Sequence, residues 1–263
     1  MRLINLMLWA FTVAFFIFMN LPIAVVVVVS FTSAGYASFP IPGWSLKWFA
    51  RIFEYTPFID SLWVSLELAV VATIASCFLG IPAALWLSRA RSGWATAVTT
   101  FLLSPLSMPM IVIGFASLFF LSWLGLGISF TSLAIVHTVI CLPYVIRTVT
   151  AVYRAVPPAY EEAALILGAS RLTTFREVTL PLIRPGIAAG CLFSFLTSFD
   201  NLPVSYFFGS AQTNTLPVVM LAYMEHQFDP SIAALSTLQL ALAVVALVVA
   251  DRLYGIEKMT VAA

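Results

Sequence analysis

The chain has 263 residues, of which 62% are hydrophobic and 9% are charged. Soluble domains carry about 25% charged residues, so this composition excludes an ordinary soluble protein and indicates a membrane protein. The formal net charge of +1 says little about partners, because the location of basic residues matters more in a membrane chain. We expect membrane lipid, and no nucleic acid, around the protein.

Six segments are long and apolar enough to cross a membrane as helices, which takes about 20 residues. They cover about residues 6–30, 61–87, 97–123, 131–150, 187–208 and 231–250. The first is too long for the apolar core of a cleaved signal peptide and is expected to stay as an anchor. The sequence therefore predicts an all-α membrane protein with six transmembrane helices, forming one transmembrane domain over residues 1–263. Prolines are expected to bend the spans at Pro105, Pro109, Pro143 and Pro203.

Basic residues predict the orientation, because Lys and Arg accumulate in cytoplasmic loops. If both termini are cytoplasmic, every basic residue except Lys47 and Arg51 falls on the cytoplasmic side. The basic residues on the cytoplasmic side are then Arg2, Arg89, Arg91, Arg147, Arg154, Arg171, Arg176, Arg184, Arg252 and Lys258. The two exceptions lie in "WSLKWFARIFEY", residues 44–55, whose apolar residues recur at helical spacing. This pattern predicts a short helix in the membrane interface, with an ordered loop as the alternative.

The longest cytoplasmic loop in this arrangement, about residues 154–185, joins the fourth and fifth spans. Residues 159–167 favour a helix, and Gly168 follows where a chain leaves a helix in the left-handed conformation. Ser170 can then cap a second helix, which we expect to end at Pro181. Such a helix-turn-helix is too polar to cross a bilayer and too apolar for a solvated linker. It either folds back on the spans or is received by a separate cytoplasmic protein.

The spacing of this loop resembles the EAA loop of type I ABC importer permeases. The matching residues are Glu162, Ala163, Ala164, Gly168, Val178, Leu180 and Pro181. Val178 replaces the isoleucine that is usual in that family. The resemblance implies that the 154–185 loop is a coupling element, which docks in a cleft of the ATP-hydrolysing subunit. Glu162 would then make polar contacts and Gly168 would set the turn.

Three further segments resemble the branch of these permeases that serves spermidine and putrescine uptake. They are "PGWSLKWF", "SFDNLPVSYFFG" and "TLPVVMLAYMEHQFDPSIAALSTLQL". Permease branches that carry phosphonates, opines or iron share parts of these three segments. The segments therefore indicate the substrate less specifically than the loop indicates the family.

The partners that the resemblance implies are a cytoplasmic ABC ATPase dimer carrying ATP and Mg, a second and different permease subunit, and a periplasmic or extracellular substrate-binding protein. The location it implies is the bacterial cytoplasmic membrane. The chain has no GxxxxGK[ST] loop and no HExxH motif. We therefore expect no enzymatic activity, no catalytic residue, no metal and no cofactor of its own. The rival classes are a transporter or channel that works alone and a membrane enzyme.

Charged residues inside spans are costly and suggest function. Asp200, beside Asn201, is interpreted as lining the path of the solute, where it would attract a cation, with a neutral carboxyl group hydrogen-bonded between helices as the alternative. Glu67 lies at a similar depth, but an interhelical hydrogen bond is favoured for it, with the path as the alternative. For His137 we expect a hydrogen-bonded place inside the bundle.

Three cysteines lie singly in apolar runs and are expected to act as small packing residues: Cys77, Cys141 and Cys191.

Overall fold

A computed structural model describes residues 2–90 and 92–254 of the chain, except for the side chains of residues 2, 3, 253 and 254. Two of the basic residues used for the orientation, Arg91 and Lys258, lie outside the described residues. The chain divides into two compact units. The first contains the residues up to Ile59 together with Met220–Ala243, and the second contains Asp60–Val219 together with the residues from Val244 onward. The prediction of a single transmembrane domain stays a prediction.

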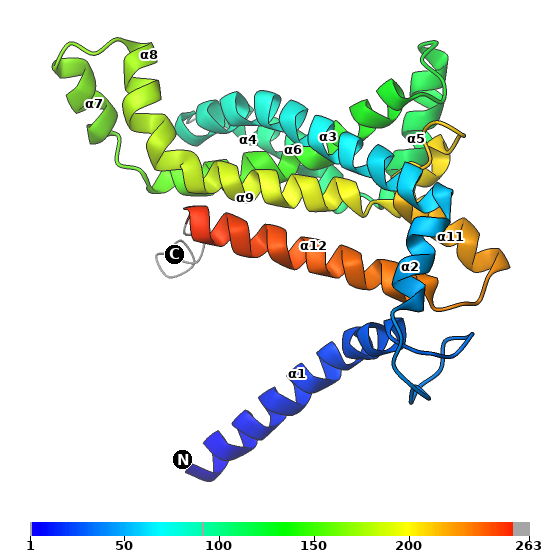
Figure 1. The fold of residues 1–263 in the computed structure, drawn as a ribbon. Helices are drawn as coiled ribbons and strands as arrows, with labels where there is room; N and C mark the ends of the chain where they lie inside the picture. Colours follow the sequence, from blue (N-terminus) through cyan, green and yellow to red (C-terminus); the bar gives the residue numbers. More distant parts are fainter. Residues whose placement is uncertain (1, 91, 255–263) are drawn as a thin grey trace. The chain divides into compact units, whose positions relative to one another are not determined.

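The regular structure of the described residues is helical (Figure 1). The helices are α1 (Arg2–Ser30), α2 (Lys47–Glu54), α3 (Thr56–Arg89), α4 (Gly93–Leu103), α5 (Met110–Trp123), α6 (Phe130–Ala155), α7 (Ala159–Ile166), α8 (Arg171–Thr174), α9 (Leu180–Phe199), α10 (Leu202–Ser205), α11 (Leu216–His226) and α12 (Ser231–Tyr254). Within the described ranges, five stretches are long and apolar enough to span a membrane: Ile4–Ser30, α3, α6, Arg171–Phe199 and Ser231–Arg252. The prediction of an all-α membrane protein is therefore confirmed.

The third predicted span, residues 97–123, is broken. Gly93–Ser107 and Met110–Trp123 meet at an angle of 107°, so they form either one broken span or a re-entrant loop. A short 3-10 turn covers Ser104–Ser107, and Pro109 precedes α5. Prolines lack a backbone donor and disfavour helical geometry in the preceding residue, which explains the break. The structure of residues 2–90 and 92–254 thus contains five candidate spans, or six if the bent pair counts as one.

The fifth predicted span, residues 187–208, is displaced. The helix runs from Arg171 to Phe199, and α10 is a separate short helix after it. The prediction that Pro181 ends a helix is wrong, because Pro181 lies in the first turn of α9. A π-helical turn over Phe175–Thr179 precedes it and leads into α9. Proline is tolerated there because the π-helical turn interrupts the regular i→i−4 hydrogen bonds, so the backbone N–H that proline lacks is not needed. Pro203 likewise begins α10, and α6 runs through Pro143.

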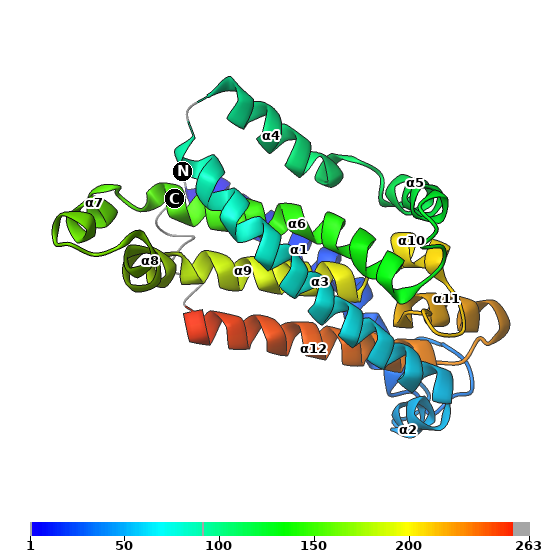
Figure 2. The same ribbon diagram turned by 90° about the horizontal axis from the view of Figure 1, so that it is seen from above.

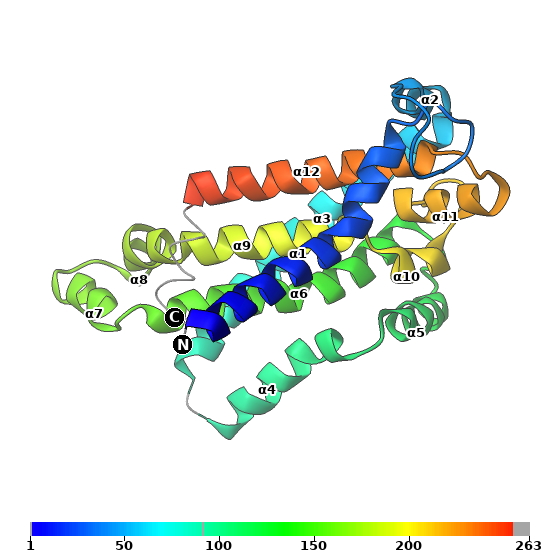
Figure 3. The same cartoon turned by 90° about the horizontal axis from the view of Figure 1, so that it is seen from below.

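The core of the second unit is built by α3, α6 and α9, which lie alongside one another (Figure 2). One cluster joins the three helices at the end near the 154–185 loop: Ala84, Val145, Val149, Tyr153, Val156 and Ile183. A second cluster joins α3, α5, α6 and α10, which Figure 3 shows at the opposite end of α6. The loop therefore stands at one end of a packed bundle.

Small residues let α6 and α9 approach closely, as is common in membrane bundles. A Cβ atom at Gly190 would lie 2.8 Å from Thr148 Oγ1 and 3.1 Å from Val145 Cα. We expect Gly190→Ala to lower the free energy of unfolding by about 1–3 kcal/mol, because the backbone of α6 cannot move away cheaply. The thermal unfolding of the detergent-solubilised protein would measure this loss. Gly35→Ala is the control, since its Cβ would meet open space, and equal stability of both variants would contradict the close approach.

The first unit contains the predicted interfacial helix, and the structure confirms its helical state as α2. Ile52 is buried, whereas Phe53 is exposed. The Lys47 ammonium group donates a hydrogen bond of 2.6 Å to the Ser33 carbonyl, and Arg51 pairs with Glu54 at 3.3 Å. Both basic residues that the orientation prediction places on the outer side thus have partners.

The cysteines pack as expected, with one addition. Cys141 is buried and donates to the Ser194 carbonyl at 3.2 Å. Cys77 on α3 and Cys191 on α9 bring their sulfur atoms within 3.3 Å of each other, and both are free thiols. The separation of these two cysteines in the sequence gave no sign of this contact.

Candidate functional site

The 154–185 loop forms two helical segments joined by a glycine turn. Helix α7 ends at Ile166, and Gly168 has φ of +88°, which only glycine adopts readily. The Ala169 N–H donates to the Ala164 carbonyl at 3.0 Å, so the turn closes the end of α7. The Ser170 hydroxyl then accepts from the Thr173 N–H at 3.2 Å and begins α8. The predicted turn and the predicted cap are both confirmed.

Large apolar side chains are exposed at the tip of this loop. Ile166 is 86% exposed and Leu167 is 87% exposed, and Leu172 on α8 is 66% exposed. The loop projects beyond the ends of α6 and α9 (Figures 1 and 2). Folding back on the spans would have buried these side chains, so the structure favours the alternative in which another surface receives the tip.

The motif residues that are far apart in sequence come together beside the tip. Ala163 from α7 lies in one hollow of about 380 Å³ with Val178 and Pro181. The other lining residues are Tyr160, Glu177 and Leu182. Glu162 is exposed, whereas Ala164 and Leu180 are half-buried. The spacing of the motif therefore has a structural reason, because its two ends meet in the folded loop.

Asp200 ends α9 and its side chain is exposed. A carboxylate at a helix C-terminus opposes the helix dipole, so the position of Asp200 lowers the stability of the fold. The adjacent Asn201 is 7% exposed, and its side-chain oxygen accepts from the Val204 N–H at 3.0 Å, so it caps α10.

Glu67 lies on an exposed stripe of α3, and its side chain makes no hydrogen bond to another described residue, so the interhelical hydrogen bond favoured from the sequence is not formed within the described part of the chain. Large apolar side chains share this stripe, including Trp63 at 66%, Ile74 at 64% and Phe78 at 80% exposure. Leu68 and Val204 belong to the same core cluster, so Glu67 and Asp200 lie at the same end of the second unit. An acid facing lipid would be costly, so we interpret this stripe as covered by protein or water in the complete assembly.

His137 is fully buried in α6 and bridges two serines. Its Nδ1 lies 2.8 Å from the Ser198 hydroxyl, and its Nε2 lies 3.1 Å from the Ser205 hydroxyl. The prediction of a hydrogen-bonded bundle residue is confirmed. These bonds fix α10 against α6 and so position the segment that follows Asp200.

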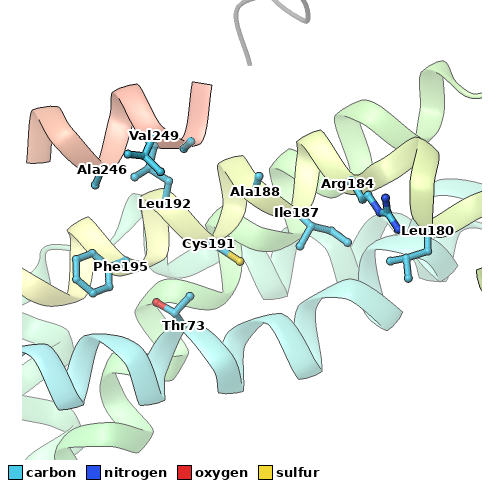
Figure 4. A pocket seen from close by; sticks show the side chains of 11 residues that line it. Thr73, Leu180, Arg184, Ile187, Ala188, Cys191, Leu192, Phe195, Ala246 and Val249 are labelled. Atoms are coloured by element: carbon cyan, nitrogen blue, oxygen red, sulfur yellow. The ribbon is translucent and has the colours of Figure 1, made fainter. Parts of the chain in front are cut away.

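A groove of about 720 Å³ lies along α9, between α3 and the C-terminal part of α12 (Figure 4). Sequence reasoning did not find it, because no periodic pattern marks the side of a helix that stays uncovered. Its lining is almost entirely apolar, with Arg184 as the charged member: Thr73, Leu180, Arg184, Ile187, Ala188, Cys191, Leu192, Phe195, Ala246, Val249 and Ala250. A cation would find no acid there. The lining therefore favours an apolar occupant such as a helix or an acyl chain.

Within the described ranges, no group of three or more His, Cys, Asp or Glu side chains is arranged to hold a metal ion. The candidate site thus consists of the 154–185 loop at one end of the second unit and the acids Asp200 and Glu67 toward the other.

Solved structures share the fold of this chain. The chain superposes on a bacterial ABC transporter involved in the import of the acidic polysaccharide alginate, with a TM-score of 0.74 and 16% identity. That match covers 95% of this chain and 96% of the other. A structure of the MetNI methionine ABC transporter matches with a TM-score of 0.62 and 19% identity, over 77% of this chain and 95% of that chain. The fold is therefore that of an ABC transporter permease.

The family follows from the sequence comparisons. The family model for the binding-protein-dependent transport system inner membrane component matches residues 76–256, and the chain belongs to this family. The chain is 30% identical to the spermidine/putrescine transport system permease protein PotC of Escherichia coli K12, covering 94% of this chain and 93% of that protein. The putrescine transport system permease protein PotI of the same strain is also 30% identical, over 85% and 82%. The molybdenum transport system permease protein ModB of Mycobacterium bovis is 33% identical, over 72% and 76%. The chain is thus a permease subunit of an ABC-type importer and a multi-pass membrane protein.

Proposed function

We propose that this permease subunit imports a polyamine, such as spermidine or putrescine, and is driven by a separate ATPase that grips the 154–185 loop. The observation that carries the proposal is the exposed apolar tip on a structured turn, at the end of a packed bundle. ATP and Mg would be bound and used in the partner ATPase dimer, and this chain would carry out no chemical step.

The tip has the properties of a docking surface. Exposed side chains of this size are expensive in water, at about 25 cal/mol for each Å² of apolar area left uncovered. Ile166 and Leu167 lie beside the exposed Glu162, so an apolar anchor is next to a charged group that can fix its orientation. Anchors surrounded by polar residues are typical of protein interfaces. A cleft in the ATPase is the occupant that the family resemblance implies.

The acids support a cationic solute. Asp200 and Glu67 lie at the same end of the second unit without a basic partner among the described side chains. Two such carboxylates would repel an anionic cargo and attract a polyamine. The proteins most relevant to this point are PotC and PotI, whose names state spermidine and putrescine transport. An aminophosphonate, an opine or an iron complex is the alternative cargo within the same importer class.

The remaining parts of the proposal concern assembly and orientation. A second, different permease subunit would complete the path and cover the exposed stripe of α3. A substrate-binding protein would deliver the solute at the outer face of the bacterial cytoplasmic membrane. Both termini and the 154–185 loop would then lie in the cytoplasm, in agreement with the distribution of basic residues.

Copurification tests the central step of this proposal. We expect the double variant Ile166→Glu with Leu167→Glu to lose the ATPase during purification, by more than about tenfold, because the apolar anchor is replaced by two charges. The amount of ATPase recovered with the tagged permease would be measured by quantitative mass spectrometry. ATP-dependent uptake by the reconstituted complex would fall in parallel.

Ile128→Glu is the matched control, because Ile128 is also an exposed isoleucine in a loop at another part of the second unit. It should keep the ATPase bound. If the unmodified chain recovers no ATPase, or moves its solute without ATP, the protein works alone as a transporter or channel and the proposal is wrong.

A further inference from the structure

The base of the 154–185 loop is held by Glu161, the residue before the glutamate of the motif. Its carboxylate accepts hydrogen bonds from two hydroxyl groups that belong to different helices. The Tyr153 hydroxyl on α6 lies 2.8 and 3.0 Å from the two oxygens, and the Thr179 hydroxyl, next to α9, lies 2.5 Å from Oε1. Tyr153 and Thr179 are both buried. One side chain of α7 is therefore tied to two helices of the bundle.

A third helix reaches the same carboxylate through Arg89, the last residue of α3. Its Nη2 lies 3.6 Å from Glu161 Oε2 and donates a hydrogen bond of 3.2 Å to the Val156 carbonyl, at the C-terminal end of α6. The guanidinium group also lies over the Tyr153 ring, 4.4 Å from its centroid. The guanidinium group thus completes the end of α6, where a positive charge is favourable, while it pairs with Glu161.

This ion pair is better shielded than the other ion pair among the described residues. The side chains of Arg89 and Glu161 are 32% and 21% exposed, whereas those of Arg51 and Glu54 are 54% and 64% exposed. Exposed pairs contribute little, because solvent screens them and two long side chains must be ordered. The Arg89–Glu161 pair is partly shielded and has additional hydroxyl donors, so it holds α7 in its orientation more firmly than an exposed pair would.

The chain connectivity shows why such a link is needed on one side of the loop. On the C-terminal side, the helical run Arg171–Phe199 joins α8 to α9 directly. On the N-terminal side, α6 ends at Ala155, and α7 begins at Ala159 after a non-helical step through Val156 and two prolines. A displacement applied to α7 would be lost in this step unless another contact crossed it. Glu161 makes that contact.

We propose that Glu161 and Arg89 form a joint that fixes the angle of the 154–185 loop to α3, α6 and α9, so that force on the loop tip reaches all three helices. This inference rests on the proposed docking of the tip. In this proposal the two neighbouring glutamates divide the work. Glu162 faces outward toward the partner, and Glu161 faces inward toward the bundle. Glu161, Arg89, Tyr153 and Thr179 are positioning residues, and none of them is proposed to touch ATP or the solute.

The test uses the full complex of permeases, ATPase and substrate-binding protein in proteoliposomes. We expect Glu161→Gln to retain the ATPase, because the tip is unchanged, but to lower the amount of solute moved per ATP hydrolysed by about tenfold. Arg89→Gln should have a similar effect. The double variant should lose no more than the worse single variant, since both changes remove the same joint. Glu54→Gln removes the exposed ion pair and serves as the control, with an unchanged ratio.

A structural role alone would lower the yield or the thermal stability of the complex without changing the ratio of transport to hydrolysis. If Glu161→Gln does not fold, Thr179→Val and Tyr153→Phe each remove one hydrogen bond and should lower the ratio by a smaller factor. The proposed joint is wrong if folded variants move the same amount of solute per ATP hydrolysed as the unmodified complex. It is also wrong if Glu161→Gln releases the ATPase. Failure of the proposed function would look different, because the unmodified complex itself would then show no ATP-dependent transport.

Discussion

Gly168→Pro is expected to abolish ATP-driven uptake, with a loss of more than about tenfold in reconstituted complexes. Gly168 has φ of +88°, and proline fixes φ near −65°. Proline also removes the Gly168 N–H, which donates to the Leu165 carbonyl at 3.0 Å. A Cβ atom at this position would meet nothing within 4 Å. The loss would therefore come from the backbone of the turn, which sets the direction of the tip, and not from a steric clash.

The chain offers a matched control for this substitution. Gly93 also has open space around a Cβ atom, and it is the first residue of α4 after the Ser92 cap. Proline is favourable at the first position of a helix, so Gly93→Pro should keep normal uptake. The rate of ATP-dependent uptake in proteoliposomes would be compared for both variants at equal protein content. Normal uptake by Gly168→Pro would show that the left-handed turn is not needed for coupling.

The second large effect is expected from neutralising the acids. Asp200→Asn should slow polyamine uptake about tenfold at saturating substrate-binding protein, and Asp200→Asn with Glu67→Gln should slow it further. A charge within about 4 Å of a cation contributes several kcal/mol in a partly shielded site, and desolvation offsets part of this gain. A net change of about 1.4 kcal/mol corresponds to a factor of ten. Both side chains are exposed in the single chain, so neither change should disturb the core.

The same measurement with Glu225→Gln provides the control, because Glu225 is an exposed acid near the end of α11 and has no proposed role. Its uptake rate should match that of the unmodified chain. If Asp200→Asn takes up spermidine and putrescine at the normal rate, Asp200 does not line the path of the solute. A selective gain in the uptake of an anionic solute by the neutralised variants would instead support the path and extend it to selectivity.

The sequence predicted the helical class of the protein and the conformation of the 154–185 loop, because both depend on local signals. The apolar segments report the spans directly, and Gly168 and Ser170 have the conformations that their residue types favour. The break near Pro109 was also marked by residue type. The sharpness of that break was not, because proline shows where a helix is weakened and not how far the two parts diverge.

The errors came from signals that depend on context. Proline ends a helix at many positions but begins one equally well, and at Pro181 the preceding π-helical turn decided between the two. Glu161 was overlooked because its neighbour Glu162 matches the motif, and sequence alone does not show which of two adjacent glutamates faces the bundle. Arg89 was counted only as a marker of orientation. Its contact with Glu161 joins residues 72 positions apart, which no local pattern predicts.

The helical run from Arg171 to Phe199 connects the two parts of the candidate site in one piece. The run is continuous but not straight, because it bends between α8 and α9 (Figure 1), where the π-helical turn over Phe175–Thr179 lies. The loop tip lies before its first residue, and Asp200 follows its last. In the proposed function, a displacement of α8 by the ATPase would be carried through this bend into α9, and so to the carboxylate that follows its last residue. The close approach of α9 to α6 at Gly190 would keep α9 in register with α6 during this displacement, so docking of the tip and movement of the proposed solute-attracting acid would be coupled.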